Sequence, residues 1–320
     1  MTGLNNDPEG AVTMTDLKAV KAIDIHMHPW TQESIYCHGT PFQEAARFFA
    51  RSPKAPQYEW VTTGKPKTID DMHHDMVKAG VEKAVILNMV AGHNWGSALS
   101  NDFIASYVRA YPDMFIGFAG IDPNMDPRGA LREIERCSKD LGLVGLKFHP
   151  PLQNFYPNDR KLAYPLYEKA AELNMTILFH SGTTLLTRCY ISPAKPEYVD
   201  QVAVDFPDLR IVMSHFGWPW TDEAIAVVWR HRNVWLDLSG WMPRYIYGAS
   251  PLTIHYMNTV LQDKICFGSD YPPLDPGAWL EDFRELFAEG YVFGGRKYEF
   301  RPGTYEKVVR LNALKALGIA

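Results

Sequence analysis

Eight short apolar segments, separated by longer amphipathic ones, constrain the fold of this chain more than any other feature. Most of the short segments are apolar almost throughout, as expected of parallel strands that are covered on both faces. They lie at residues 22–28, 83–90, 114–121, 143–149, 175–180, 209–215, 234–238 and 264–268. Helical patterns accompany them at 69–79, 101–111, 126–140, 162–174, 221–230, 251–259, 278–289 and 306–317.

Eightfold repetition of strand and helix is typical of an α/β fold of the (β/α)8 TIM-barrel type, which commonly uses about 250 residues or more as one domain. An open doubly wound sheet is the alternative, but no glycine-rich phosphate loop follows any of the strands. We expect a leader at residues 1–22, followed by a single barrel domain at 23–320. A long insertion after strand 1, at 29–68, lies on the side where a barrel carries its active site, so we expect it to shape the substrate pocket.

Composition excludes several classes of protein. With 32 Lys+Arg and 37 Asp+Glu the net charge is −5, and no basic run occurs, so we expect no nucleic-acid partner. No apolar stretch of about 18 residues exists and the first 22 residues lack an apolar signal core, so we expect neither a membrane span nor secretion. The four scattered cysteines favour a reducing cytoplasm. A homo-oligomer is left open.

Ionisable side chains stand at the carboxyl ends of five of the eight expected strands, or directly after them. They are His26, His28, Lys147, His180, His215 and Asp270. Burial of such groups is costly unless they are paired or bind a metal. Since residues 26 and 28 are two apart on a strand, both imidazoles are expected to point into the mouth of the barrel.

Three imidazoles and one carboxylate form a suitable ligand set for one divalent metal. The residues that can supply it are His26, His28, His180 and Asp270. Zn²⁺ is the metal we expect, with Mn²⁺ as the alternative. His215 would lie beside the metal and donate a proton, accept one or polarise the substrate. A single histidine at a strand end is more often structural, but the joint pattern disfavours that interpretation for the whole set.

Five motifs resemble those of the amidohydrolase superfamily, in particular the branch that includes aminocarboxymuconate-semialdehyde decarboxylase and several aromatic-acid decarboxylases. The motifs are DIHMH at 24–28, GLKFHP at 145–150, ILFH at 177–180, SHFG at 214–217 and FGSDYP at 267–272. The resemblance implies His26, His28, His180 and Asp270 as metal ligands and His215 as the catalytic histidine. It also implies that Asp270 takes a proton from the metal-bound water.

Lys147 has two interpretations. In many hydrolytic members of the superfamily a lysine at the end of strand 4 is carboxylated and bridges two metals, so a second metal is expected only if Lys147 is modified in this way. The alternative, which we prefer, is that Lys147 binds a substrate carboxylate or pairs with an acid beyond the metal ligands. Aromatic and basic residues after later strands suit a flat organic acid, and we assign Trp218, Trp241 and Arg244 to substrate binding.

Three hypotheses for function follow. The first is a metal-dependent hydrolase that activates water at the mouth of the barrel, with Asp270 and His215 as catalytic residues, and acts on a small cyclic or unsaturated carboxylic acid. The second is a zinc-dependent nonoxidative decarboxylase of an aromatic or muconate-type acid. The third is a catalytically inactive barrel that serves as a binding module, which is disfavoured because no expected metal ligand is missing.

Overall fold

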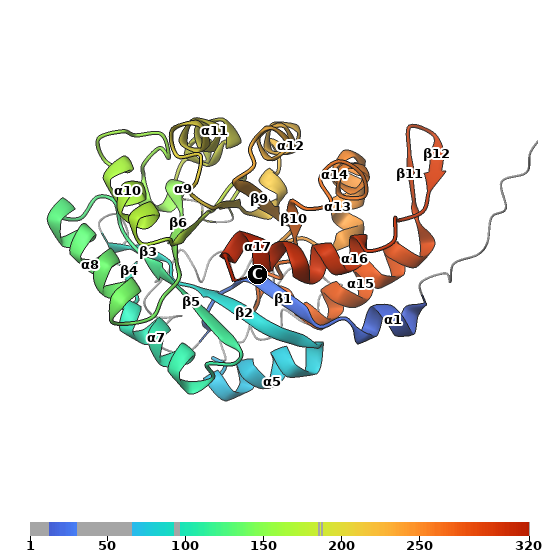
Figure 1. Ribbon diagram of the computed structural model, residues 1–320, viewed down its shortest axis with the longest axis horizontal. Coiled ribbons are helices and arrows are strands. Elements are labelled where there is room, and N and C mark those ends of the chain that lie inside the picture. Colours follow the sequence, from blue (N-terminus) through green and yellow to red (C-terminus); the bar gives the residue numbers. More distant parts are fainter. Residues whose placement is uncertain (1–12, 31–65, 93–96, 185, 187, 320) are drawn as a thin grey trace, which may run out of the picture.

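A closed ring of eight parallel strands forms the centre of the molecule, which is a computed structural model that describes residues 13–30, 66–92, 97–184, 186 and 188–319 (Figure 1). The strands pair in the order β1-β2-β5-β6-β7-β8-β9-β10. They are β1 (Ala22–Met27), β2 (Val81–Leu87), β5 (Phe115–Gly120), β6 (Gly145–Phe148), β7 (Thr176–Phe179), β8 (Ile211–Met213), β9 (Val234–Asp237) and β10 (Ile265–Cys266). A parallel bridge between Met27 and Tyr271 joins the first strand to the last. The predicted (β/α)8 barrel is confirmed.

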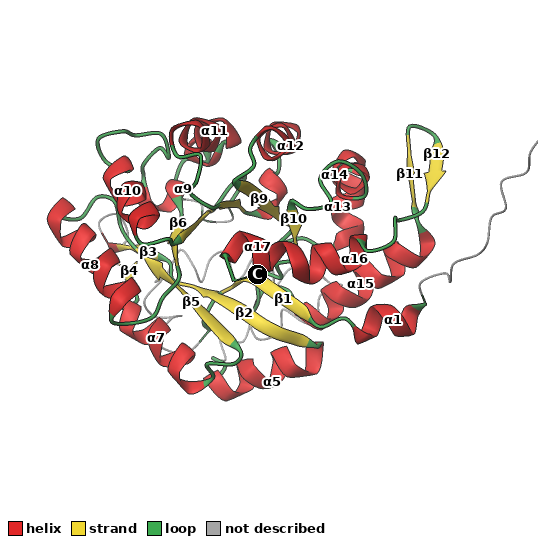
Figure 2. Ribbon diagram, in the orientation of Figure 1, coloured by secondary structure: helices red, strands yellow, loops and turns green. Residues whose placement is uncertain are grey.

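Helices surround the strands on the outside of the barrel (Figure 2). The longer ones are α5 (Ile69–Ala79), α7 (Asn101–Ala110), α8 (Pro127–Lys139), α10 (Tyr164–Glu172), α11 (Pro196–Asp205), α12 (Thr221–Arg230), α13 (Pro243–Ala249), α14 (Pro251–Met257) and α15 (Pro276–Glu289). The C-terminal region contains α16 (Thr304–Glu306), a π-helical turn at Lys307–Leu311 and α17 (Asn312–Leu317). Shorter elements are α1 (Met14–Ala19), α9 (Pro150–Gln153), 3-10 turns at Ser192–Ala194 and His215–Gly217, and the two-stranded pairs β3 (Val90–Ala91) with β4 (Ser97–Ala98) and β11 (Tyr291–Phe293) with β12 (Arg296–Tyr298).

Helix α11 was not predicted from the sequence. Its N-cap residue, Lys195, makes no side-chain capping bond, so the start of the helix is marked by Pro196 at the first helical position but not by a capping side chain. The helix is held by packing instead, because Val199, Val202 and Ala203 are buried against the core. Tertiary burial therefore overrides a weak local pattern.

The expected leader at residues 1–22 contains a short helix, because residues 14–19 form α1. Thr13 and Asp16 make a capping box at its start, and Leu17 is buried against the core. The insertion predicted at 29–68 falls largely on residues 31–65, which lie outside the described residues. Its flanks meet, since the amide of Lys67 donates to the carbonyl oxygen of Trp30 at 2.7 Å.

The apolar core has two layers. One lies between the strands and the surrounding helices and contains residues such as Phe148 and Phe179. The other takes side chains from the opposite face of the strands, among them Val85, Leu178 and Val212, together with residues of α17. Figure 1 shows α17 lying across one end of the barrel. Helix α17 closes this end of the barrel. The ionisable side chains lie at the opposite end, where the carboxyl ends of the strands meet.

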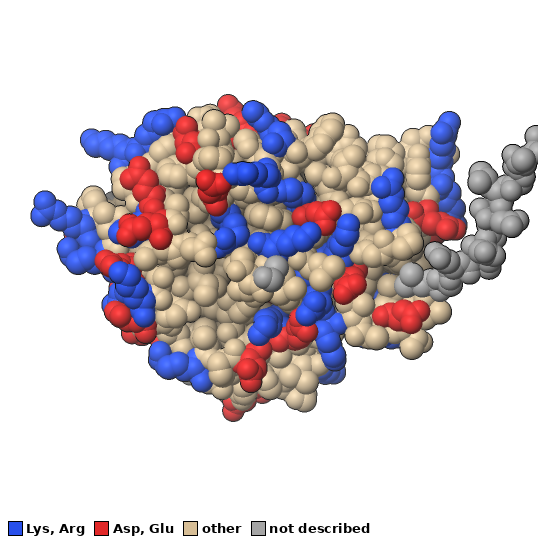
Figure 3. Space-filling view, in the orientation of Figure 1, with Lys and Arg blue, Asp and Glu red and all other residues tan. Residues whose placement is uncertain are grey.

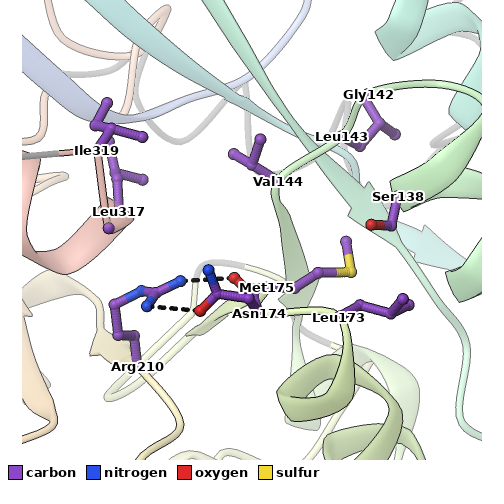
Figure 4. Close-up of a pocket in the computed structure, with 11 residues that line it drawn as sticks. Ser138, Gly142, Leu143, Val144, Leu173, Asn174, Met175, Arg210, Leu317 and Ile319 are labelled. Carbon is purple, nitrogen blue, oxygen red and sulfur yellow. Dashed lines mark hydrogen bonds between the residues drawn. The ribbon is translucent and has the colours of Figure 1, made fainter.

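A hollow of about 250 Å³ lies where α17 ends, beside the residues that precede β6, β7 and β8 (Figure 4). Arg210 reaches across it and donates to the side-chain and main-chain oxygens of Asn174 at 3.0 and 2.6 Å and to Oγ1 of Thr176 at 3.1 Å. Gly318 ends α17 with φ at 68°, and a Cβ there would lie 2.6 Å from Cζ of Arg210. Glycine at this position thus lets the guanidinium of Arg210 pack against the end of α17.

The Gly318→Ala substitution is therefore expected to lower the free energy of unfolding by about 1–2 kcal/mol, since it combines a left-handed backbone with a steric conflict. Gly80→Ala is the matched control, because Gly80 ends α5 at φ 79° with no atom near its missing Cβ. Urea unfolding of both variants measures the difference. Equal destabilisation by the two substitutions would show that the Arg210 contact contributes nothing.

None of the described helices has both the length and the apolar character that crossing a membrane requires. Acidic and basic side chains are interspersed on the face in Figure 3, so that this face shows no field of a single sign.

Candidate active site

Two imidazoles and one carboxylate converge at the carboxyl end of the barrel. Nε2 of His26 and Nε2 of His28 each lie 3.5 Å from Oδ1 of Asp270. His26 belongs to β1, His28 follows it, and Asp270 follows β10, so closure of the barrel brings residues about 240 positions apart into contact. These three groups lie close enough together to hold one metal ion. Two imidazole nitrogens and a carboxylate oxygen are suitable ligands for Zn²⁺ or Mn²⁺.

The outer nitrogens of both rings are already engaged. Nδ1 of His26 lies 2.9 Å from Oδ2 of Asp237, and Nδ1 of His28 lies 3.2 Å from the carbonyl oxygen of Leu87. Because these oxygens accept hydrogen bonds, each Nδ1 carries the proton. Each Nε2 therefore keeps its lone pair for a metal ion bound between the two histidines and Asp270. Burial lowers the pKa of His26 to about 4, with the charge of Lys147 adding to the effect, so the ring is neutral. This is the arrangement expected of metal-binding histidines.

His180 lies next to this group and contacts His215. Its Nδ1 is 3.1 Å from Nε2 of His215, and its Nε2 is 3.0 Å from the carbonyl oxygen of Thr183. Nδ1 of His215 faces the carbonyl oxygen of Ser239 at 3.1 Å. The two carbonyl oxygens place a proton on Nε2 of His180 and on Nδ1 of His215. The unprotonated nitrogens, Nδ1 of His180 and Nε2 of His215, therefore face each other with their lone pairs. The structure thus leaves His180 with a nitrogen available to a cation, although it does not place His180 in the group of three.

Positive backbone φ angles occur at both residues predicted to be catalytic and at Phe216, which follows His215. His215 has φ at 57° and Asp270 has φ at 63°, a region that side chains other than glycine rarely adopt. Gly240 packs against both, since a Cβ there would lie 3.1 Å from Nδ1 of His215 and 3.3 Å from Oδ2 of Asp270. Such strain persists where the surrounding structure fixes side chains for function.

Asp237, at the end of β9, is the functional residue that sequence reasoning missed. It accepts hydrogen bonds from Nδ1 of His26, from the amide of His215 at 3.1 Å and from the hydroxyl of Ser239. Although burial alone would raise it, the pKa of Asp237 is held below its usual range by His26, His215 and Ser239. An acid at the end of an otherwise apolar strand, VWLDL, was the signal that could have revealed it.

Asp237→Asn is expected to weaken metal binding by about 10–100-fold, because an amide cannot accept all three hydrogen bonds and His26 loses its orientation. Titration of the metal-free protein with Zn²⁺ and Mn²⁺ measures the effect. Asp205→Asn, at a carboxylate that binds Arg160 and Tyr164 on the outer surface, is the control. An unchanged affinity in Asp237→Asn would show that the contact does not orient His26.

Lys147 lies fully buried beside the group, with Nζ 3.4 Å from Nε2 of His26. Burial lowers its pKa, while the carboxylates of Asp237 and Asp270 act in the opposite direction. Among the described residues no carboxylate oxygen lies within salt-bridge distance of Nζ. The amine is therefore placed at the site, as predicted, but without a partner acid.

The predicted substrate-binding residues divide into two groups. Trp218 and Trp241 lie next to each other after β8 and β9, with ring centroids 5.1 Å apart, and Trp218 is partly exposed. Arg244 does not support its assignment, because its guanidinium binds Asp282, Glu285 and Glu289. These surface contacts occupy the charge that was expected to bind the substrate.

The fold and the His–His–Asp group, of which His26 is buried and His28 and Asp270 are partly exposed, define a (β/α)8-barrel protein with a candidate divalent-metal site at the carboxyl ends of its strands. A family model described as Amidohydrolase matches residues 23–319. The chain belongs to the amidohydrolase family, which confirms the predicted superfamily and the prediction of a hydrolase or carboxy-lyase of that superfamily.

Two curated relatives are each less than one third identical to the chain. Gamma-resorcylate decarboxylase of Polaromonas sp. is 29% identical, over 57% of this chain and 68% of the relative. 2-Keto-4-carboxy-3-hexenedioate hydratase of Sphingobium sp. is 28% identical, over 38% of this chain and 40% of the relative. The second match thus spans well under half of the hydratase.

Two solved structures share the fold over almost their whole length. An uncharacterized TIM-barrel protein from Bordetella bronchiseptica has a TM-score of 0.73 at 26% identity, covering 93% of this chain and 99% of that one. 5-Carboxyvanillate decarboxylase from Novosphingobium aromaticivorans, solved with bound manganese and 3-methoxy-4-hydroxy-5-nitrobenzoic acid, has a TM-score of 0.65 at 18% identity, covering 99% and 100%. At that identity the second likeness concerns the fold alone.

Proposed function

We propose that the protein is a metal-dependent nonoxidative decarboxylase of a hydroxylated aromatic acid. The observation that carries the proposal is the group in which two histidine nitrogens lie 3.5 Å from one oxygen of Asp270, in a chain related to gamma-resorcylate decarboxylase. We therefore favour the second hypothesis, a decarboxylase, over the first, a hydrolase. The two relatives are a decarboxylase and a hydratase, and neither is a hydrolase by name.

A divalent metal suits the donor set. We assign His26, His28 and Asp270 as ligands, with His180 as a further ligand through its Nδ1 lone pair, which faces His215 in the structure. When bound, the metal supplies Lewis-acid polarisation of substrate oxygens. Zn²⁺ and Mn²⁺ are both candidates, the second because a decarboxylase of the same fold was solved with manganese.

Decarboxylation requires a proton at the ring carbon that bears the carboxylate. That carbon gains a proton, its bond to the carboxylate carbon breaks, the electron pair returns to the ring, and carbon dioxide leaves. Asp270 is suited to carry the proton, because Oδ1 faces the two histidines while Oδ2 lies beside Gly240, the glycine that also packs against His215. His215 stands beside it as the second proton-handling group.

Substrate binding is assigned to Lys147 and the two tryptophans. The amine of Lys147 contacts His26 and has no carboxylate partner, so a substrate carboxylate would supply its missing counter-charge. Trp218 and Trp241 offer adjoining aromatic faces after β8 and β9 for a flat ring. The alternative is carboxylation of Lys147, which would require the amine in its neutral form and would allow a second metal.

Product analysis tests the proposal. Purified protein loaded with Zn²⁺ or Mn²⁺ is incubated with 2,6-dihydroxybenzoate, 5-carboxyvanillate, 2-pyrone-4,6-dicarboxylate and 2-keto-4-carboxy-3-hexenedioate. We expect carbon dioxide and the decarboxylated phenol from an aromatic acid. Exclusive lactone opening would support hydrolysis, exclusive gain of water by the hexenedioate would support hydration, and either would contradict the proposed decarboxylase.

A further inference from the structure

His149 is buried at the end of β6 and has no role in the site described so far. It is two residues beyond Lys147, so that both side chains leave the strand on the same face. Its ring is 4% exposed and stacks on that of His180, with centroids 3.8 Å apart and planes at 13°. A further imidazole thus lies directly against His180, the additional ligand of the proposed metal centre.

The tautomer of His149 is fixed by its own backbone. His149 is the N-cap of α9, and its Nδ1 accepts a hydrogen bond from the amide of Leu152 at 3.2 Å. Nδ1 therefore carries no proton, and the proton of the ring is on Nε2. The backbone here is also fixed, because Gln153 accepts from the amide of His149 at 2.8 Å and donates to the carbonyl oxygens of Val90 and Ile121, both at 2.7 Å.

Nε2 of His149 is consequently a rigid N–H donor, and among the described residues no acceptor lies within hydrogen-bond distance of it. The residue is 4% exposed and makes its side-chain hydrogen bond through Nδ1, so the Nε2 donor is left for solvent or for a bound ligand. The neighbouring side chains, Lys147 and His180, offer it no negative oxygen. A donor of this kind suits an oxygen of a bound ligand.

We propose that His149 binds the substrate, with Nε2–H donating to a carboxylate or phenolate oxygen of the aromatic acid. This inference rests on the proposed function for the class of acid. It assigns to His149 a role in affinity and selection, separate from the proton transfer assigned to Asp270 and His215. Together with Lys147 it gives strand β6 two donors, one amine and one imidazole N–H, for an anionic ligand.

Two substitutions separate this role from the structural one. Asn in place of His149 keeps an oxygen that can cap Leu152 but removes the Nε2 donor. Gln in place of His149 keeps an N–H at the distance of Nε2 but loses the cap. Binding of 2,6-dihydroxybenzoate and of benzoate to the metal-loaded variants is measured by calorimetry, with melting temperature and metal content as checks on the fold.

We expect His149→Asn to lose about tenfold or more in affinity, as for a hydrogen bond to a charged group, and His149→Gln to stay within about threefold of wild type. Loss with both ligands identifies the carboxylate as the partner, and loss with the dihydroxy acid alone identifies a phenolic oxygen. Equal affinity of His149→Asn and wild type would overturn the inference, as would failure of the wild type to bind either acid. Binding without release of carbon dioxide would instead contradict only the proposed decarboxylase.

Discussion

The Asp270→Asn variant is expected to lose at least about 10³-fold in kcat and most of its bound metal. The substitution keeps the shape of the side chain but removes the charge that holds Oδ1 near His26 and His28. It also removes the oxygen that we assign to proton transfer, so both proposed tasks of this residue fail together. Metal content per chain and the initial rate of carbon dioxide release measure the two effects.

Asp275→Asn is the matched control for this prediction. Asp275 follows the same strand but caps α15, accepting from the amide of Ala278 at 2.8 Å, and asparagine caps helices equally well. Its activity should therefore stay close to that of wild type. Full turnover and full metal content in Asp270→Asn would show that Asp270 neither binds the metal nor transfers the proton.

The second large effect is expected at His215. His215→Asn should retain the metal, because His215 is not part of the group formed by His26, His28 and Asp270. It should lower kcat by about 10²–10⁴-fold, the range typical of a lost proton-transfer group. His231→Asn is the control, since His231 pairs with Asp200 between α11 and α12. Rates and metal content together separate the two tasks.

A different outcome at His215 would reassign the ligands. His26, His215 and Asp237 form a second buried cluster that is also close enough to hold an ion. Loss of metal together with activity in His215→Asn would therefore support that cluster. Retained activity would contradict a catalytic role for His215 altogether.

The sequence predicted the barrel because its strands are nearly continuous apolar runs, a pattern with few alternative folds. It also predicted which polar residues meet, because parallel strands bring their carboxyl ends to one edge. It failed where packing rather than pattern decides. Helix α11 has no capping signal and forms because Val199 and Val202 are buried, and α1 forms within an apparent leader because Leu17 is buried.

Within the site, the sequence indicated which residues meet but not how they are oriented. The hydrogen bond from His26 to Asp237 joins residues 211 positions apart, so no local pattern contains it. The tautomer of His149 depends on a turn formed by the two prolines that follow it. Arg244 failed as a ligand for the substrate because three acids on α15 bind its guanidinium, a contact that spacing along the chain does not show.

The most direct measurement of the central claim is carbon dioxide release from 2,6-dihydroxybenzoate by the same preparation before and after removal of its metal. We expect release by protein loaded with Zn²⁺ or Mn²⁺, its loss after chelation, and its return when either ion is added back. Undiminished release by metal-free protein would contradict a metal-dependent site built on His26, His28 and Asp270. Absence of release by fully loaded protein, from this acid and from other hydroxylated aromatic acids, would contradict the decarboxylase itself.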